Sequence, residues 1–286
     1  MKSEDFELFS GIVRQRSGLV LTPEKAYLIE SRLTPVVRKY NLKTLEDMAD
    51  LIRSKKDESI LKDITEAMTT NESFFFRDNK PFTNFQNIVL PKLLTARADK
   101  KHIRIWSAAS SSGQEAYSLA MICSEMAARL TGWRIDIVGT DISREMVERS
   151  RQGIYSQFEV QRGLPVTHLV KYFQQLSSDR WQISEKLRAM ATFREANLLT
   201  DVNSLGAFDV VFCRNVLIYF DVPTKKRVLD SIYNLMPNDG VLFLGGAETV
   251  LGISDKFSPM PGEHGMYVKS TEAKPQSAFA ATGTKI

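Results

Sequence analysis

Residues 103–121, IRIWSAASSSGQEAYSLAM, decide the fold, because they contain a short apolar run, a turn of small residues and the start of a helix. Residues 103–106 are mainly β-branched or aromatic, which favours a strand. From Tyr117 onward the apolar residues recur with a helical period. In open α/β sheets such a turn lies at the carboxyl end of a strand, where small side chains and the N–H groups of the next helix accommodate a ligand. The stretch therefore predicts a strand, a ligand-binding turn and a helix.

The composition of this turn restricts the ligand. A phosphate-binding P-loop would need the pattern G-K-[ST], and a dinucleotide-binding turn would need three spaced glycines, whereas Gly113 stands alone here. Glu115 follows it, and a carboxylate in this position repels phosphate and attracts a cation. The alternative is that Glu115 only complements the dipole of the helix. The turn thus favours a positively charged or hydroxyl-rich ligand over a phosphate.

Strand and helix patterns alternate through most of the chain. Strands are predicted at residues 103–106, 135–140, 191–195, 210–213, 241–245 and 266–269. Helices are predicted between them at 115–130, 144–151 and 224–236, and before them at 81–98. This alternation predicts an α/β fold with a mainly parallel, doubly wound sheet. Residues 1–70 contain only short amphipathic helical patterns, at 4–16, 23–40, 44–53 and 58–68, and predict a small all-helical domain.

Residues 153–190 interrupt the alternation, because they are too long for a simple crossover. Within them, KYFQQLSSDRWQIS predicts two strands, at 171–176 and 180–184, about a Ser-Ser-Asp turn. We interpret this interval as an inserted antiparallel hairpin. Residues 271–286 are small, polar and aperiodic, and predict a disordered tail.

The composition excludes several classes of protein. The chain has 286 residues, of which 43% are hydrophobic, enough for a sizeable core. No apolar run reaches the length of a membrane span, and the first residues are too charged for a signal peptide, so we expect a cytoplasmic protein. Cys123 and Cys213 lie in apolar runs and the three histidines are scattered. We therefore expect buried thiols, no metal site and no histidine general base.

Basic residues are concentrated near the N-terminus, between Arg14 and Lys43. Lys25, Arg32 and Lys39 are spaced by seven and would share one face of a helix, which suggests a binding face for an acidic substrate. The alternative is an ordinary solvated face. Pro35 predicts a break or kink in that helix.

Polar residues follow the other predicted strands where those strands end. Asp141 follows the second strand, a position in which an acid commonly binds a ribose diol; the alternative is a helix N-cap at Asp141 or Ser143. Together with Glu115, Asp141 suggests a nucleoside with a cationic group, which fits S-adenosylmethionine better than NAD. Asn197 follows the third strand, and the fourth strand ends at a group of polar residues, Arg214, Asn215 and Tyr219. The alternative for Arg214 is a structural salt bridge.

Five segments together resemble one family. MTTNESFFFRD, IWSAASSSGQEAYS, GTDIS, ANLL and DVVFCRNVLIYFD, in this order and spacing, are similar to the chemotaxis receptor glutamate methyltransferases of the CheR type over residues 5–270. The resemblance implies an all-helical N-terminal domain at 1–70 and a Rossmann-like methyltransferase domain at 71–270 with an inserted antiparallel β-subdomain at 153–190. It also implies S-adenosylmethionine as cofactor, S-adenosylhomocysteine as product and the cytoplasmic helices of chemoreceptors as partners.

The resemblance also assigns roles to individual residues. Arg77 and Tyr219 are expected to lie nearest the transferred methyl group, as the catalytic pair. The positions expected to bind the cofactor are Asn71, Ser73, Arg77, Glu115, Asp141, Asn197, Leu198, Arg214 and Asn215. Ser73 stands where many members have Thr, and Gln114 and Ala116 stand where the family often has an acid and a proline. The phenylalanines at 74–76 could pack against the ligand, but core packing is the simpler interpretation for most of that run.

The implied reaction is O-methylation of receptor glutamates to methyl esters. A glutamate carboxylate has a pKa of ~4.3, so it is already a nucleophile at neutral pH and needs no general base.

Two alternative functions are a nucleic-acid methyltransferase and a non-catalytic module that senses S-adenosylmethionine. The first commonly has [ND]-P-P-[YF] after the fourth strand, where this chain has NVLI at 215–218. We expect a monomer that binds no nucleic acid. Because the lead-in FEVQRGLP resembles members without a receptor tether, we also expect methylation to be independent of a receptor's terminal peptide.

Overall fold

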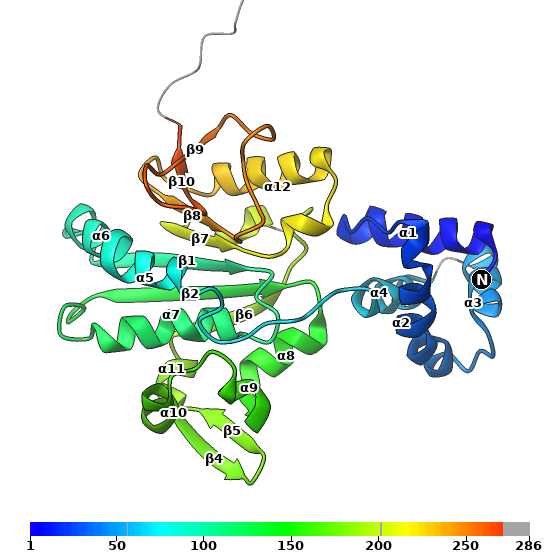
Figure 1. Cartoon of the computed structure of the whole chain (residues 1–286), viewed down its shortest axis with the longest axis horizontal. Coiled ribbons are helices and arrows are strands. Elements are labelled where there is room, and N and C mark those ends of the chain that lie inside the picture. Colours follow the sequence, from blue (N-terminus) through cyan, green and yellow to red (C-terminus); the bar gives the residue numbers. More distant parts are fainter. Residues whose placement is uncertain (56, 201, 271–286) are drawn as a thin grey trace, which may run out of the picture.

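A seven-stranded sheet forms the centre of the computed structural model, which describes residues 1–55, 57–200 and 202–270 (Figure 1). The strands lie in the order β6 (Ala191–Glu195), β2 (Arg134–Asp141), β1 (His102–Ala108), β7 (Val210–Cys213), β8 (Val241–Leu244), β10 (Met266–Lys269) and β9 (Phe257–Pro259). The first five are mutually parallel, whereas β10 and β9 add antiparallel pairs at one edge. The six strands predicted from the sequence are present, and β9 was not predicted.

Helices cover both faces of this sheet. The helices α7 (Gln114–Glu125) and α8 (Arg144–Gln152) belong to one face, where their side chains share a core with β1 and β6. The helix α12 (Val222–Asn234) packs on the other face through Val228, Leu229 and Ile232. Because β1 leads to β2 on one side and has β7 on its other side, the strand order reverses between β1 and β7. The predicted α/β, doubly wound architecture is confirmed.

The segment before β1 is helical, as predicted, but its middle turn is a π-helix instead of an α-helix. It comprises α5 (Lys80–Asn84), a π-helical turn η2 (Phe85–Val89) and α6 (Leu90–Ala96). The N–H of Leu90 bonds to the carbonyl of Phe85, five residues earlier. The next residue, Pro91, has no N–H to donate, and a helix commonly changes its hydrogen-bond pattern at such a position.

The N-terminal residues form four helices with a core of their own, α1 (Ser3–Ser17), α2 (Ala26–Lys39), α3 (Leu45–Ser54) and α4 (Glu58–Ala67). A capping box between Thr44 and Asp47 starts α3. Of the break or kink predicted at Pro35, the break is absent, since α2 continues through this residue. Leu33, Val36 and Val37 on either side of Pro35 are buried in the helical core, and this packing holds the helix together.

The inserted interval is more helical than the sequence suggested. Its three-stranded antiparallel sheet has the order β3 (Ile154–Ser156), β5 (Arg180–Ile183), β4 (Phe173–Ser177). Short helices lie around it: α9 (Gln157–Gln161), α10 (Val166–Tyr172) and α11 (Glu185–Arg188). The predicted strand at 171–176 was wrong at its start, because Lys171 and Tyr172 end α10, where both bond to Glu125 of α7 at 2.9 and 2.6 Å. The short strand β3 was not predicted.

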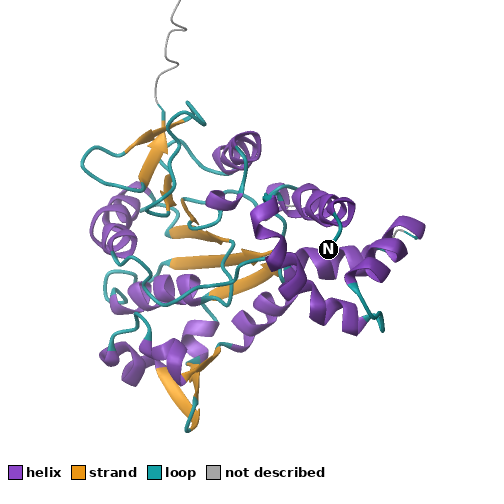
Figure 2. Cartoon of the chain, turned by 45° about the vertical axis from the view of Figure 1, so that its right-hand side comes forward, coloured by secondary structure: helices purple, strands orange, loops and turns teal. Residues whose placement is uncertain are grey.

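The helical domain lies at the edge of the sheet where the parallel strands end (Figures 1 and 2). Arg144, just after β2, bonds to Asp63 and Glu66 of α4 at 2.7 and 2.6 Å. Asn197, after β6, donates to the carbonyl of Arg16 at 2.5 Å. The N-terminal helices therefore cover the ligand-binding edge of the sheet. Among the described residues, no helix has the length and apolarity needed to cross a membrane.

Candidate active site

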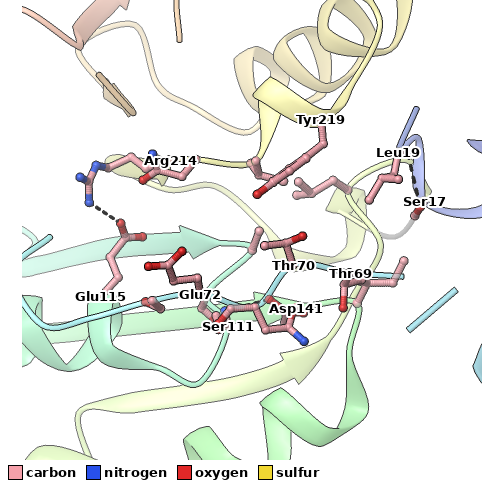
Figure 3. A pocket seen from close by; sticks show the side chains of 18 of the residues that line it. Ser17, Leu19, Thr69, Thr70, Glu72, Ser111, Glu115, Asp141, Arg214 and Tyr219 are labelled. Atoms are coloured by element: carbon pink, nitrogen blue, oxygen red, sulfur yellow. Dashed lines mark hydrogen bonds and ion pairs between the residues drawn. The ribbon is translucent and has the colours of Figure 1, made fainter. Parts of the chain in front are cut away.

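A single pocket at this edge collects the site residues predicted from the sequence (Figure 3). It lies between the loops that follow β1 and β7, where the strand order reverses and α/β folds commonly bind ligands. The predicted cofactor-binding and catalytic residues all line it, namely Asn71, Ser73, Arg77, Glu115, Asp141, Asn197, Leu198, Arg214, Asn215 and Tyr219. Residues from distant parts of the chain thus meet in one cavity.

The loops around this pocket have an unusual backbone conformation. Ala109, Ser111 and Asn215 have φ values of 56°, 50° and 59°, in the left-handed region that non-glycine residues rarely adopt. Gly113 has a φ of 90°, and a Cβ atom there would lie 2.9 Å from the Ser150 hydroxyl oxygen. Such backbone conformations cost energy and concentrate at binding sites, where the surrounding structure enforces them.

Asp141 fixes the loop after β1. One carboxylate oxygen accepts the N–H of Ser111 at 2.8 Å, and the other accepts the N–H of Ser143 at 2.9 Å. Burial raises the pKa of Asp141 above its ordinary value, although the N–H groups of Ser143 and Ser111 oppose this shift. The N–H of Ile142 also interacts with this carboxylate, which has about four lone-pair positions, so the carboxylate can still accept a hydroxyl from a ligand. Ser143, and not Asp141, is the N-cap of α8.

Glu115 and Arg214 form an ion pair in the wall of the pocket. Glu115 accepts the Ser107 hydroxyl at 2.8 Å. It also accepts a guanidinium N–H of Arg214 at 2.9 Å (Figure 3). Arg214 also bonds to the carboxylate of Asp78 at 2.8 Å, and its side chain is only 2% exposed. The sequence alternative of a structural salt bridge at Arg214 is thus realised, and the cation attracted by Glu115 is one from the protein itself. Since two carboxylates surround one guanidinium, this cluster has a net negative charge.

Glu248 holds the loop after β7, and it was not among the residues predicted from the sequence. One of its carboxylate oxygens accepts the N–H groups of Asn215 and Gly245 at 2.7 Å each. The other accepts the N–H groups of Val216 at 2.9 Å and Ile218 at 3.2 Å. Glu248 is 5% exposed, so these four bonds are shielded from water. The only signal in the sequence was a lone acid soon after an apolar strand.

Arg77 and Tyr219 reach the pocket from different segments. A guanidinium N–H of Arg77 donates to the carbonyl of Glu72 at 3.0 Å, and its central carbon lies 5.4 Å from the centre of the Phe74 ring. The carbonyl of Tyr219 accepts the N–H of Val20 at 3.0 Å, which joins this loop to the helical domain. Figure 3 shows Tyr219 and Arg214 on one side of the cavity and Glu72 on the other.

The helical domain and the linker contribute residues that sequence reasoning missed. Ser17 and Leu19, just after α1, line the pocket, as do Thr69 and Thr70 after α4. Leu19 also forms a β-bridge with Phe220 beside Tyr219. No pattern in the sequence marked residues 17–19, because only the docking of the helical domain brings them to the pocket.

The three basic residues predicted to bind substrate differ in their surroundings. Lys25 is exposed. Arg32 donates to the carbonyls of Met68 at 2.7 Å and Thr69 at 3.0 Å, at the junction with the sheet domain. Lys39 pairs with Asp63 at 2.6 Å, and Asp63 in turn binds Arg144. Two of the three therefore have contacts inside the protein.

The arrangement suits a ligand with a diol and an amino-acid group. Asp141 lines the pocket, where its carboxylate can accept a hydroxyl of a ribose diol. The cluster of Glu115, Asp78 and Arg214 offers partners for both an ammonium and a carboxylate. Glu115 and Asp141 lie at separate places along the pocket, so both ends of an elongated ligand can be bound at once (Figure 3).

Comparison with known proteins agrees with this geometry. Residues 71–266 match the family described as CheR methyltransferase, SAM binding domain, and residues 4–69 match CheR methyltransferase, all-alpha domain. The chemotaxis protein methyltransferase of Vibrio parahaemolyticus is 36% identical, over 94% of this chain and 98% of that one. Chemotaxis protein methyltransferase 1 of Pseudomonas aeruginosa is 38% identical, over 88% of this chain and 93% of that one.

The matched domain binds S-adenosylmethionine, and the pocket has groups suited to the ribose and to the amino-acid part of this cofactor. Together, the two family matches span both the helical domain and the sheet domain. The chain belongs to the CheR family of chemotaxis methyltransferases, with S-adenosylmethionine as its cofactor.

Proposed function

We propose that this protein methylates glutamate side chains of chemoreceptors to methyl esters, acting in the cytoplasm as a monomer. The observation that supports it most is the composition of the pocket. Arg77 and Tyr219 lie in the same cavity as the cofactor-binding acids, and no described residue that lines it is His, Cys or Lys. Such a pocket suits a nucleophile that is already ionised, because a glutamate carboxylate with a pKa of ~4.3 needs no general base at neutral pH.

In this proposal the cofactor supplies an electrophilic methyl group, and the residues of the chain bind and orient. Asp141 accepts hydrogen bonds from the ribose hydroxyls, and the Glu115, Asp78 and Arg214 cluster holds the amino-acid part. Arg77 orients the substrate carboxylate by charge-assisted hydrogen bonds, and the Tyr219 hydroxyl donates another. Holding the two reactants in line can contribute about 7 to 11 kcal/mol at best to lowering the barrier.

The substrate is proposed to approach along the helical domain. Acidic receptor helices are proposed to contact three basic residues of this domain, Lys25, Arg32 and Lys39. The contacts of Arg32 with the Met68 carbonyl and of Lys39 with Asp63 suggest a second role for these two, in fixing the helical domain. Lys25 is therefore the residue at which substrate binding can be tested without disturbing the domain junction.

The decisive experiment uses the full chain, labelled S-adenosylmethionine and receptor-rich membranes. A glutamyl ester releases its methyl group in mild alkali, so we expect alkali-labile label on the receptor. Alkali-stable label on nucleic acid would indicate the nucleic-acid methyltransferase instead. Binding of the cofactor without transfer of label would indicate a non-catalytic module.

Arg77→Ala should abolish most of this transfer, with Arg129→Ala as the matched control. Arg129 is an exposed arginine that does not line the pocket. Normal turnover of a folded Arg77→Ala variant would show that Arg77 does not orient the substrate.

A further inference from the structure

The inserted subdomain makes close contact with the segment that carries Arg77. Phe75 is fully buried, and its ring meets those of Tyr155 at 5.0 Å and Phe173 at 5.6 Å, both from the insertion. The next ring, of Phe76, lies 5.5 Å from that of His168 in α10. The insertion therefore packs on the run of phenylalanines that the sequence assigned mainly to the core.

The closest approach between the two segments is at Gly163. Its φ is +80°, and a Cβ atom there would lie 2.1 Å from the carbonyl oxygen of Phe75. Only glycine fits, because the backbone of the insertion lies directly against the backbone of the segment and cannot yield as a flexible side chain would. The residue beside it, Arg162, is thereby fixed over the segment.

Arg162 holds the same two residues that Arg77 contacts. Its guanidinium pairs with the carboxylate of Glu72 at 2.5 Å and lies 4.4 Å from the centre of the Phe74 ring. Arg77 donates to the carbonyl of Glu72 at 3.0 Å and lies 5.4 Å from the same ring. Glu72 and Phe74 thus connect the two arginines, and both also line the pocket.

We propose that Arg162 is a positioning residue for methyl transfer, which fixes Glu72 and Phe74 so that Arg77 is held in its orientation toward the substrate. The inserted subdomain would then support the catalytic segment, in addition to covering the methyltransferase domain. This inference rests on the proposed role of Arg77 in the methylation of receptor glutamates. The hydrogen bond from Arg162 also lowers the pKa of Glu72, which agrees with a carboxylate paired with a guanidinium.

The test compares Arg162→Ala with a matched control, Arg149→Ala. Arg149 pairs with Glu159 of the insertion at 2.9 Å, and its side chain is 39% exposed, against 40% for Arg162. Both variants lose one ion pair between the insertion and the rest of the chain, but only Arg162 touches Glu72 and Phe74. For Arg162→Ala we expect kcat to fall by roughly ten- to a hundredfold, the range that a small misplacement of a reacting group can cost. Calorimetry should show a Kd for S-adenosylmethionine within about threefold of the original, and Arg149→Ala should keep its kcat.

Two further variants distinguish positioning from a general structural role. In an Arg77→Ala background, Arg162→Ala should lower kcat no further, since the residue through which it acts is already absent. Arg162→Lys should recover part of the loss, because lysine can pair with Glu72 but cannot lie flat on Phe74.

A kcat for Arg162→Ala equal to that of Arg149→Ala would overturn the inference. The inference would also fail if Arg162→Ala lowered kcat by the same factor in the original protein and in the Arg77→Ala variant. If Arg77→Ala itself turns over normally, the proposed role of Arg77 fails. A slow Arg77→Ala with a normal Arg162→Ala refutes only the positioning role.

Discussion

Replacing Glu248 by glutamine should destabilise the whole protein and weaken its cofactor site. The carboxylate of Glu248 accepts four backbone N–H groups, two at each oxygen, within a site that is 5% exposed. Glutamine has the same size, but its NH2 group cannot accept a hydrogen bond. Whichever way the amide turns, two buried N–H donors lose their partner.

Each such buried donor costs about 1 to 3 kcal/mol, so we expect the free energy of unfolding to fall by roughly 2 to 6 kcal/mol. For a chain of this size the Tm should fall by at least about 4 °C. The Kd for S-adenosylmethionine should rise as well, because the held loop carries Asn215 and follows Arg214. Urea unfolding and calorimetry measure the two effects, with Glu7→Gln on the exposed surface of α1 as the control. A Glu248→Gln protein within about 1 kcal/mol of the original stability would refute the reasoning, since it would mean that the four N–H groups find other partners.

Four further changes test other parts of the molecule. Asp141→Ala should raise the Kd for S-adenosylmethionine by roughly ten- to a hundredfold in calorimetry, because it removes a buried acceptor; an unchanged Kd would contradict the ribose contact. Asp221 bonds to Thr224 and Arg14, which lower its pKa to about 2, so its stabilising effect is complete above its ordinary pKa of 3.8 and is lost as the pH falls toward 2. The stability difference between the original protein and Asp221→Asn should therefore shrink over that interval, and a constant difference would refute this. Lys25→Glu should slow receptor methylation at low salt and leave the Kd for the cofactor unchanged; equal rates would mean that Lys25 is only solvated surface. Removing the terminal peptide of a receptor should leave its methylation rate unchanged, whereas a large loss would identify the β4 and β5 sheet as a docking site.

The layout of the fold followed from local patterns in the sequence. Strands have alternating or continuous apolar residues, whereas helices have apolar residues with a period of 3.6. A few residues suffice to distinguish these two patterns, and β6, β7 and β10 were therefore predicted with their observed bounds. The position of the pocket followed as well, because polar residues after parallel strands must meet at one edge of the sheet. The insertion was harder to predict: β3 has only three residues and pairs with β5, which begins 24 residues after β3 ends.

The tertiary structure alone decided how the charges of the site are paired. Arg214 meets Glu115 across 99 residues and Asp78 across 136, and Asn197 reaches the carbonyl of Arg16 across 181. The carboxylate of Glu248 accepts backbone N–H groups, and Arg32 donates to two backbone carbonyls as well as to the Thr70 hydroxyl. Every residue has such backbone groups, and no sequence pattern distinguishes them. A sequence specifies which groups are available and which segments must be buried. Which of these groups bond to each other depends on the three-dimensional distances that packing sets, because hydrogen bonds and ion pairs act over only a few ångströms.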